Sequence, residues 1–203
     1  MCIAAFAWQA HPLYPFLLLQ NRDEYHNRPT EPLAWWEGCE ILGGRDEVAG
    51  GTWLACSRGG RVAFITNVLE LHALPEAKSR GDLPVLFLES TKTPKEFAAE
   101  LIKEAHQYNG FNLIVADISS KTMFYVSNRP KGEPTLMQEV SPGIHVLSNA
   151  KLDSPWHKGP YGTRSTAALT IKASGEVSFY EMHLDKDTWK EKTVNYHIQR
   201  LKS

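Results

Sequence analysis

The sequence contains few cysteines, and their placement argues against a disulfide-bonded secreted protein. Three occur among 203 residues, Cys2, Cys39 and Cys56, and they are widely spaced. An odd number at such spacing does not make a disulfide framework and is typical of a reducing compartment. We therefore expect an intracellular protein.

Long apolar runs and an excess of charge of one sign are also missing. No run approaches the roughly 18 apolar residues of a membrane-spanning helix, and the apolar start lacks the basic region and cleavage site of a signal peptide. Lysine and arginine number 22 against 23 acidic residues, and the basic residues are scattered. The sequence thus shows no footprint for nucleic acid or an anionic membrane. We expect a cytoplasmic protein without a transmembrane segment or a nucleic-acid partner.

Motifs for metals and nucleotides are missing as well. The eight histidines are dispersed, and no CxxCH haem-attachment motif is present. The glycine pairs 43–44 and 50–51 match neither the phosphate-binding loop nor the dinucleotide fingerprint. We expect no bound metal and no cofactor.

What the sequence does have is a distinctive N-terminus. Cys2 opens the apolar run 3–8, and a second apolar run, 16–19, leads into the tetrad Asn21-Arg22-Asp23-Glu24. An antiparallel hairpin would place Arg22 and Asp23 near Cys2. If Met1 is removed, the thiol and α-amine of Cys2 would face an arginine and a carboxylate, as in N-terminal-nucleophile amidohydrolases, and the thiol should ionise readily. The alternative is a buried core cysteine followed by a solvated turn.

The remaining pattern predicts an α+β fold of antiparallel strands in one domain, residues 1–203. Strands are expected at residues 51–56, 61–68, 111–117, 122–127, 144–147, 166–171, 177–182 and 188–199. Helices are expected at 83–88 and from 94 to 109–110, the second with a Thr93/Glu96 capping box. Residues 25–37 and 128–142 should be loops, and 43–51 a turn region. The strand at 62–65 is apolar on both faces, which indicates two stacked sheets with helices outside.

Two asparagines stand at strand ends, Asn67 and Asn149. A buried amide needs hydrogen-bond partners or serves as a donor itself. A turn-forming asparagine is the alternative at Asn67.

Seven motifs occur in chain order. They are Cys2, Asn21-Arg22-Asp23-Glu24, Gly50-Gly51-Thr52-Trp53-Leu54, Thr66-Asn67, Tyr108-Asn109-Gly110-Phe111-Asn112-Leu113, Leu147-Ser148-Asn149-Ala150 and Tyr161-Gly162-Thr163-Arg164. This combination resembles the transport and Golgi organisation protein 2 family, or NRDE proteins, over nearly the whole chain. That family is similar to cysteine N-terminal-nucleophile hydrolases such as the bile-salt and penicillin-V amidases, which implies an αββα sandwich.

The resemblance also implies site residues. The tetrad would bind the ligand, and the catalytic set would be Cys2, Arg22, Asp23, Asn67, Asn149 and Arg164. Cys2 would attack a carbonyl while its α-amine, oriented by Asp23, takes the proton. Asn67 would donate to the oxyanion, and Asn149 and Arg164 would hold the site together electrostatically.

Function follows from the resemblance in three forms. The first is a protein of Golgi organisation, secretion and haem or lipid homeostasis that handles a lipophilic small molecule such as acyl-CoA or haem, associated with mitochondria or the Golgi. The second is a cysteine amidohydrolase or thioesterase acting on a small amide or thioester. The third is a structural adaptor for secretory-pathway proteins.

The chain departs from the family in one place. A long helical segment separates the Ser-Asn-Ala and Gly-Thr-Arg motifs of the family, whereas only residues 151–161 lie between them here. We therefore expect one helical layer to be shortened, with a segment missing between residues 150 and 161. Apolar sheet surface should be left open as a result.

Overall fold

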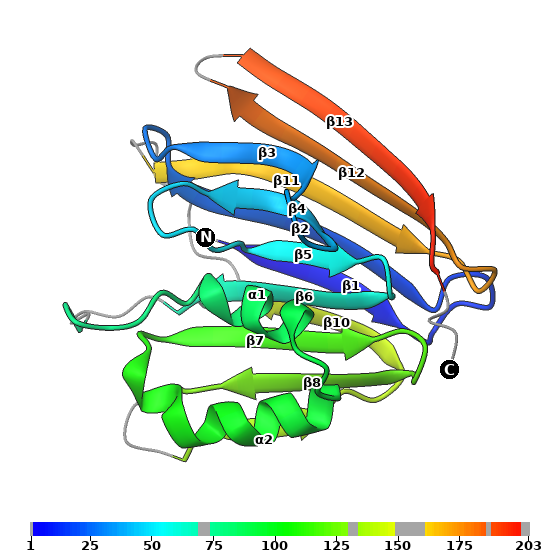
Figure 1. Ribbon diagram of the computed structural model, residues 1–203, viewed down its shortest axis with the longest axis horizontal. Helices are drawn as coiled ribbons and strands as arrows, with labels where there is room; N and C mark the ends of the chain where they lie inside the picture. Colours follow the sequence, from blue (N-terminus) through cyan, green and yellow to red (C-terminus); the bar gives the residue numbers. More distant parts are fainter. Residues whose placement is uncertain (1, 69–73, 130–133, 149–160, 186–187, 200–203) are drawn as a thin grey trace.

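The chain folds into two antiparallel sheets that pack face to face, shown in Figure 1. The computed structural model describes residues 2–68, 74–129, 134–148, 161–185 and 188–199. The six-stranded sheet has the order β10 (Gly143–Ser148), β1 (Ile3–Trp8), β2 (Phe16–Tyr25), β11 (Tyr161–Ile171), β12 (Glu176–Asp185) and β13 (Thr188–His197). The seven-stranded sheet has the order β3 (Thr30–Trp35), β4 (Ile41–Asp46), β5 (Leu54–Ser57), β6 (Arg61–Asn67), β7 (Phe111–Asp117), β8 (Thr122–Ser127) and β9 (Leu136–Glu139).

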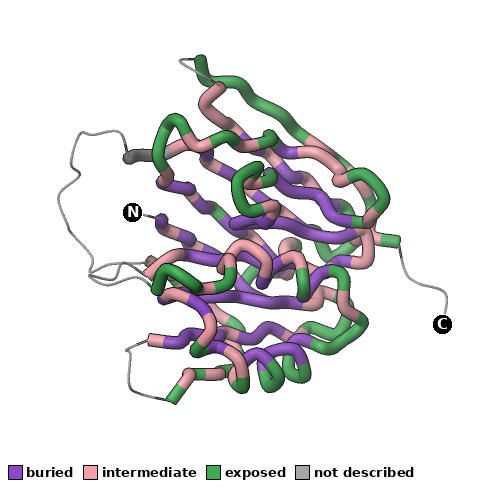
Figure 2. Tube along the Cα trace, turned by 60° about the vertical axis from the view of Figure 1, so that its left-hand side comes forward, coloured by how far each residue is buried: buried purple, intermediate pink, exposed green. Residues whose placement is uncertain are grey.

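Aromatic residues join the two sheets. Phe6 and Phe16 point inward from the hairpin, and their ring centroids lie 5.3 and 6.5 Å from that of Phe64 on the facing strand β6. The inward side chains alternate with more exposed ones along β1, as one buried sheet face requires. In Figure 2 the buried segments form a continuous band through both sheets.

Two helices cover the outer face of the seven-stranded sheet. Helix α1 (Asp82–Glu89) packs on β5 and β6, and α2 (Pro94–Glu104) packs on β8 and β9. The predicted capping box is confirmed: the Thr93 hydroxyl accepts from the Glu96 amide at 3.2 Å, and the Glu96 carboxylate accepts from the Thr93 amide. Neither described helix is long and apolar enough to cross a membrane.

Helix α2 stops earlier than predicted. A 3-10 turn, η1 (Ala105–Gln107), follows it before the Asn109-Gly110 pair is reached. The Asn128 amide, which arrives from the end of β8, donates to the carbonyls of Ala105, Tyr108 and Asn109. This tertiary contact satisfies the end of the helical segment.

Three strands were not predicted. The expectation of a loop at 25–37 and a turn at 43–51 is wrong, because β3 and β4 lie there. Glycine is needed in β4 for close packing: a Cβ on Gly43 would lie 2.8 Å from that of Ala55, and one on Gly44 would lie 2.5 Å from the Trp53 ring. The predicted 128–142 loop contains edge strand β9, whose mainly exposed side chains give no apolar pattern.

The α+β sandwich is confirmed, with helices described on one side of it. On the outer face of the six-stranded sheet, Ile144, Leu19 and Val146 are 82, 65 and 62% exposed. The bridge in which we expected the missing segment, residues 150–160, lies outside the described residues. The described layers are therefore sheet, sheet and helix, with apolar side chains exposed on the outer face of the six-stranded sheet.

Candidate active site

The predicted N-terminal hairpin is confirmed and sets the position of Cys2. Pairing of Ile3 with Asn21 brings Cys2 beside the backbone of Asp23. The Asp23 amide donates to the Cys2 sulfur at 3.4 Å, and the Cys2 side chain is 5% exposed. The nucleophile candidate is therefore held by the strand that carries the tetrad.

Asn21 holds the neighbouring carboxylate. Its amide oxygen accepts from the Ile3 backbone N–H at 3.0 Å, and its amide nitrogen donates to Asp23 Oδ1 at 2.8 Å. Because Asn21 spans the two strands, the buried Asp23 carboxylate is fixed at the N-terminal end of β1. The tetrad thus has a defined geometry and is not a solvated turn.

Arg22 lies in a cluster of charges on the inner side of the hairpin. Its guanidinium donates to Asp46 Oδ2 at 3.3 Å and lies 4.2 Å from the centre of the Trp53 ring. Arg28 shares the same carboxylate oxygen at 2.6 Å. Burial lowers the pKa of Arg22, while Glu24 and Asp46 oppose that shift, so Arg22 stays cationic at neutral pH. Burial alone would raise the pKa of Asp46, but bonding to Arg28 and to backbone amides holds it below its ordinary value.

The thiol of Cys2 is not activated in the chain as it stands. Burial raises the pKa of Cys2, and the Asp23 charge adds to that shift, while the Asp23 amide and Arg22 oppose it. The prediction of a readily ionised thiol assumed an α-ammonium on Cys2 itself. With Met1 still attached, desolvation outweighs the nearby positive charge.

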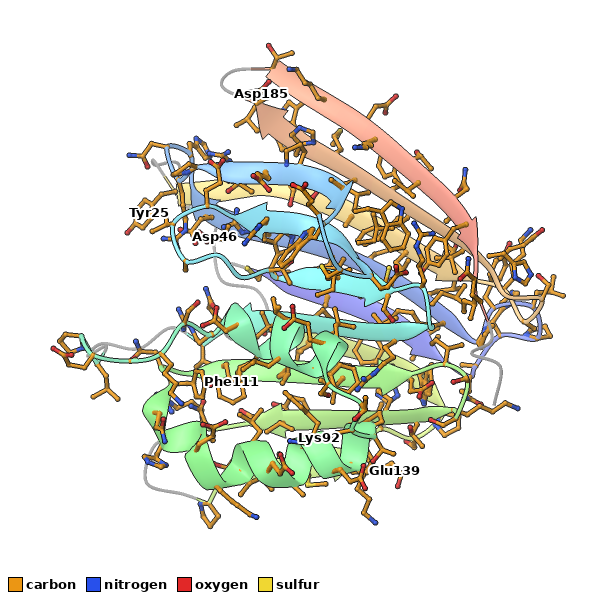
Figure 3. The ribbon with its side chains drawn as sticks, in the orientation of Figure 1. Tyr25, Asp46, Lys92, Phe111, Glu139 and Asp185 are labelled. Atoms are coloured by element: carbon orange, nitrogen blue, oxygen red, sulfur yellow. The ribbon has the colours of Figure 1, made fainter. Side chains whose placement is uncertain are left out.

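One pocket of about 330 Å³ brings together four of the predicted site residues, Cys2, Arg22, Asp23 and Asn67. Asn67 reaches it from the end of β6, where it pairs with Phe111. Asp46 and Phe111, labelled in Figure 3, lie at the same end of the sandwich. Glu24 of the tetrad also lines the pocket. A pocket of this size holds a small ligand.

Six further pocket residues were not predicted as functional groups. They are Arg28, Asp46, Trp53, Lys78, Arg80 and Asn109. Arg28, in the connection between β2 and β3, and Asp46, at the end of β4, are 18 residues apart, and only the folded strands bring them together. Trp53 and Asn109 could have been found, because each belongs to one of the seven motifs.

Arg164 is not among the residues that line this pocket. Arg164 lies at the register shift of β11, between Thr163 and Ser165, and donates to the Leu184 carbonyl at 3.3 Å. Together with Glu181 it borders a separate cavity of about 10 Å³, and Arg22 and Trp53 line both this cavity and the Cys2 pocket. Asn149 lies outside the described residues. The described part of the chain has no cluster of three or more histidine, cysteine or acidic side chains that could hold a metal.

Comparison with known proteins decides the family. The family model for transport and Golgi organisation 2 matches residues 1–160. The chain belongs to this family. Its homologues from the mouse and from humans are 38 and 36% identical over 173 residues, which cover 80% of this chain and 62% of each relative. The fruit-fly transport and Golgi organization protein 2 is 28% identical over 88% of this chain and 68% of its own. The chain thus spans about 62% of the mouse and human members.

The fold of this family member also has a solved counterpart. The C2A mutant of the conjugated bile acid hydrolase from Clostridium perfringens superposes with a TM-score of 0.56 over 98% of both chains, at 9% identity. At this identity the likeness concerns the fold alone. It agrees with the predicted resemblance to N-terminal-nucleophile hydrolases.

Proposed function

We propose that this chain is a cysteine hydrolase of small amides or thioesters and that the Cys2 pocket is its active site. The supporting observation is that Cys2, the adjacent pair Arg22 and Asp23, and Asn67, which come from three separate stretches of the chain, line one pocket. A nucleophile, a carboxylate, a cation and an amide donor are the groups that acyl transfer needs. Removal of Met1 would add the fifth group, an α-amine on Cys2.

The reaction would begin with proton transfer from the Cys2 thiol to that α-amine, whose ordinary pKa is about 8. Asp23, fixed by Asn21, would orient the amine. The sulfur would then form a bond to the substrate carbonyl carbon, and the oxyanion would accept a hydrogen bond from Asn67, an interaction of roughly 3 kcal/mol. The ammonium would protonate the leaving amine or thiol as its bond to carbon breaks. Water would hydrolyse the acyl-cysteine and release a carboxylic acid.

The lining of the pocket favours a polar substrate. The volume of about 330 Å³ suits a small ligand or the reacting end of a larger one, and the charged residues around Cys2 suit a polar acyl compound better than an apolar ring system such as haem. The predicted haem ligand therefore finds little support in this pocket.

Acyl-CoA is a second candidate and belongs to the same chemistry, because it is a thioester. Arg28, Lys78 and Arg80 line the pocket and could face the phosphates of such a substrate. Two of them also have acidic neighbours, Asp46 for Arg28 and Glu104 for Lys78. The predicted effects on Golgi organisation, secretion and lipid homeostasis would follow from this chemistry and stay predictions, as does the location in the cell.

Turnover measurements test the proposal. Protein lacking Met1 is incubated with short acyl thioesters and with N-acyl amides, and release of the free thiol or amine is followed. We expect turnover that Cys2→Ala abolishes and that the matched control Cys39→Ala leaves unchanged, since Cys39 does not line the pocket. Equal turnover by Cys2→Ala would reject the proposal.

A further inference from the structure

The outer face of the six-stranded sheet is an ordered apolar surface. In one row across five strands, Val146, Ala5, Leu19, Ala168 and Tyr180 lie opposite one another in register. Because directly paired residues share a sheet face, their side chains all point away from the core. Val146 and Leu19 are 62 and 65% exposed. The apolar surface is therefore continuous across the strands.

The two adjoining rows extend this face. They are Ile144, Ala7, Leu17, Thr170 and Ser178 on one side, and Ser148, Ile3, Asn21, Thr166 and Met182 on the other. None of the fifteen side chains in the three rows is charged. The sixth strand, β13, continues the rows with Thr193, Asn195 and Glu191, and the Tyr180 hydroxyl donates to the Glu191 carboxylate at 3.1 Å. The centres of protein interfaces are likewise depleted of charged residues. The solvated face of an antiparallel sheet, in contrast, ordinarily carries polar and charged side chains.

No described helix or strand lies over this face. Helices α1 and α2 pack against the other sheet, as Figure 1 shows. The five strands that carry the three rows, about 4.8 Å apart and on average about 28 Å long, give the face an area of roughly 700 Å², within the range of about 600–1,000 Å² that a standard interface buries on each partner. The face is therefore large enough to support a dimer.

The chemistry of the face favours a copy of itself over other partners. A neutral face meets its own copy without like-charge repulsion, and two sheets pack face to face by interdigitating apolar side chains. A charged peptide would find no counter-charge in the three rows, and an anionic membrane would find no basic residues. We propose that this chain forms a two-fold symmetric dimer through the outer face of its six-stranded sheet. The dimer leaves the Cys2 pocket at the end of the sandwich open and does not depend on the proposed chemistry.

Sedimentation velocity of the full chain over a concentration series tests the dimer. We expect wild type to sediment as a dimer at micromolar concentrations. Leu19→Lys should weaken dimerisation at least tenfold, because symmetry places two lysines in one interface. Ile144→Lys, at a position 82% exposed, should do the same with little risk to folding. The matched control is Leu86→Lys, on α1 at 46% exposure, which should dimerise as wild type does.

Circular dichroism of each variant separates loss of the dimer from loss of the fold. A folded monomer for Leu19→Lys or Ile144→Lys, with a dimeric Leu86→Lys, supports the proposal. A monomeric wild type at all concentrations overturns it, as does a dimer that survives both substitutions on the sheet. Binding of monomeric wild type to phosphatidylcholine vesicles, lost in Leu19→Lys, would also overturn it and assign the face to lipid.

Discussion

Replacing Arg22 by lysine tests how the charged cluster beside Cys2 is held together. Arg22 donates to Thr30 Oγ1 at 3.2 Å and to Asp46 Oδ2 at 3.3 Å, and it stacks on Trp53. Lysine keeps the charge, but its ammonium has no planar fork with which to make all these contacts at once. The substitution therefore changes geometry while leaving the net charge of the cluster the same.

The expected cost follows from the contacts that are lost. A hydrogen bond to a charged group contributes about 1.5–3 kcal/mol, and a partly desolvated cation–ring contact about 1–2 kcal/mol. The retained charge and the Arg28 bond to Asp46 offset part of this loss. We expect the free energy of unfolding to fall by about 2 kcal/mol, which corresponds to a Tm about 4–8 °C lower for a chain of this length.

Urea unfolding and thermal melts at one fixed protein concentration measure the effect, since dimerisation makes Tm depend on concentration. Arg28→Lys is the matched control. Its side chain is 30% exposed, so the same substitution should cost less than about 1 kcal/mol. A loss for Arg22→Lys no larger than that for Arg28→Lys would refute the account of the cluster.

Three further predictions concern charge, reactivity and packing. The pKa of Asp46 is lower in the folded chain than its unfolded value near 3.8. The ionised carboxylate therefore stabilises the fold above pH 3.8, and this stabilisation is lost as the pH falls through the folded pKa. Asp46→Asn should therefore destabilise the fold more at pH 7 than at pH 2, and a difference in urea unfolding that does not depend on pH would contradict this. The pH midpoint of Cys2 alkylation should lie above the ordinary thiol pKa of about 8.5 while Met1 is present, and it should fall once Met1 is removed. Mass spectrometry measures the midpoint at each cysteine. Equal midpoints with and without Met1 would show that the α-amine does not act on the thiol. Gly44→Ala should lower the free energy of unfolding in urea by about 1–3 kcal/mol, because the added Cβ would meet the Trp53 ring. Gly59→Ala is the control and should be tolerated, since the nearest atom to its Cβ would be 3.7 Å away. Equal stability of the two variants would contradict the close packing of β4.

Much of the site could be predicted because its elements are local. The hairpin of β1 and β2 follows from two apolar runs separated by a proline-bearing turn, and it alone brings Cys2 to Asp23. The capping box of α2 is likewise encoded within four residues. Asn67 stood out as an amide at a strand end, the resemblance gave it a role, and it lines the same pocket.

The parts that were missed depend on contacts between distant segments. Glycines at 43 and 44 suggested a turn, whereas their small size is needed where β4 meets Ala55 and Trp53. The pairing of Arg28 with Asp46 depends on how the β2–β3 connection meets the end of β4. Arg164 was assigned by resemblance, and no local pattern reveals its position at the register shift of β11, beside a cavity that it shares with Arg22.

The central claim is that Cys2 is an acyl-accepting nucleophile that depends on its own α-amine. Intact mass spectrometry of protein mixed with an activated acyl thioester, quenched in acid within seconds, measures this directly. We expect one acyl group on the peptide that begins with Cys2 in protein lacking Met1, and none in protein that retains Met1. Acylation at the same rate on Cys39, or at Cys2 irrespective of Met1, would contradict the claim.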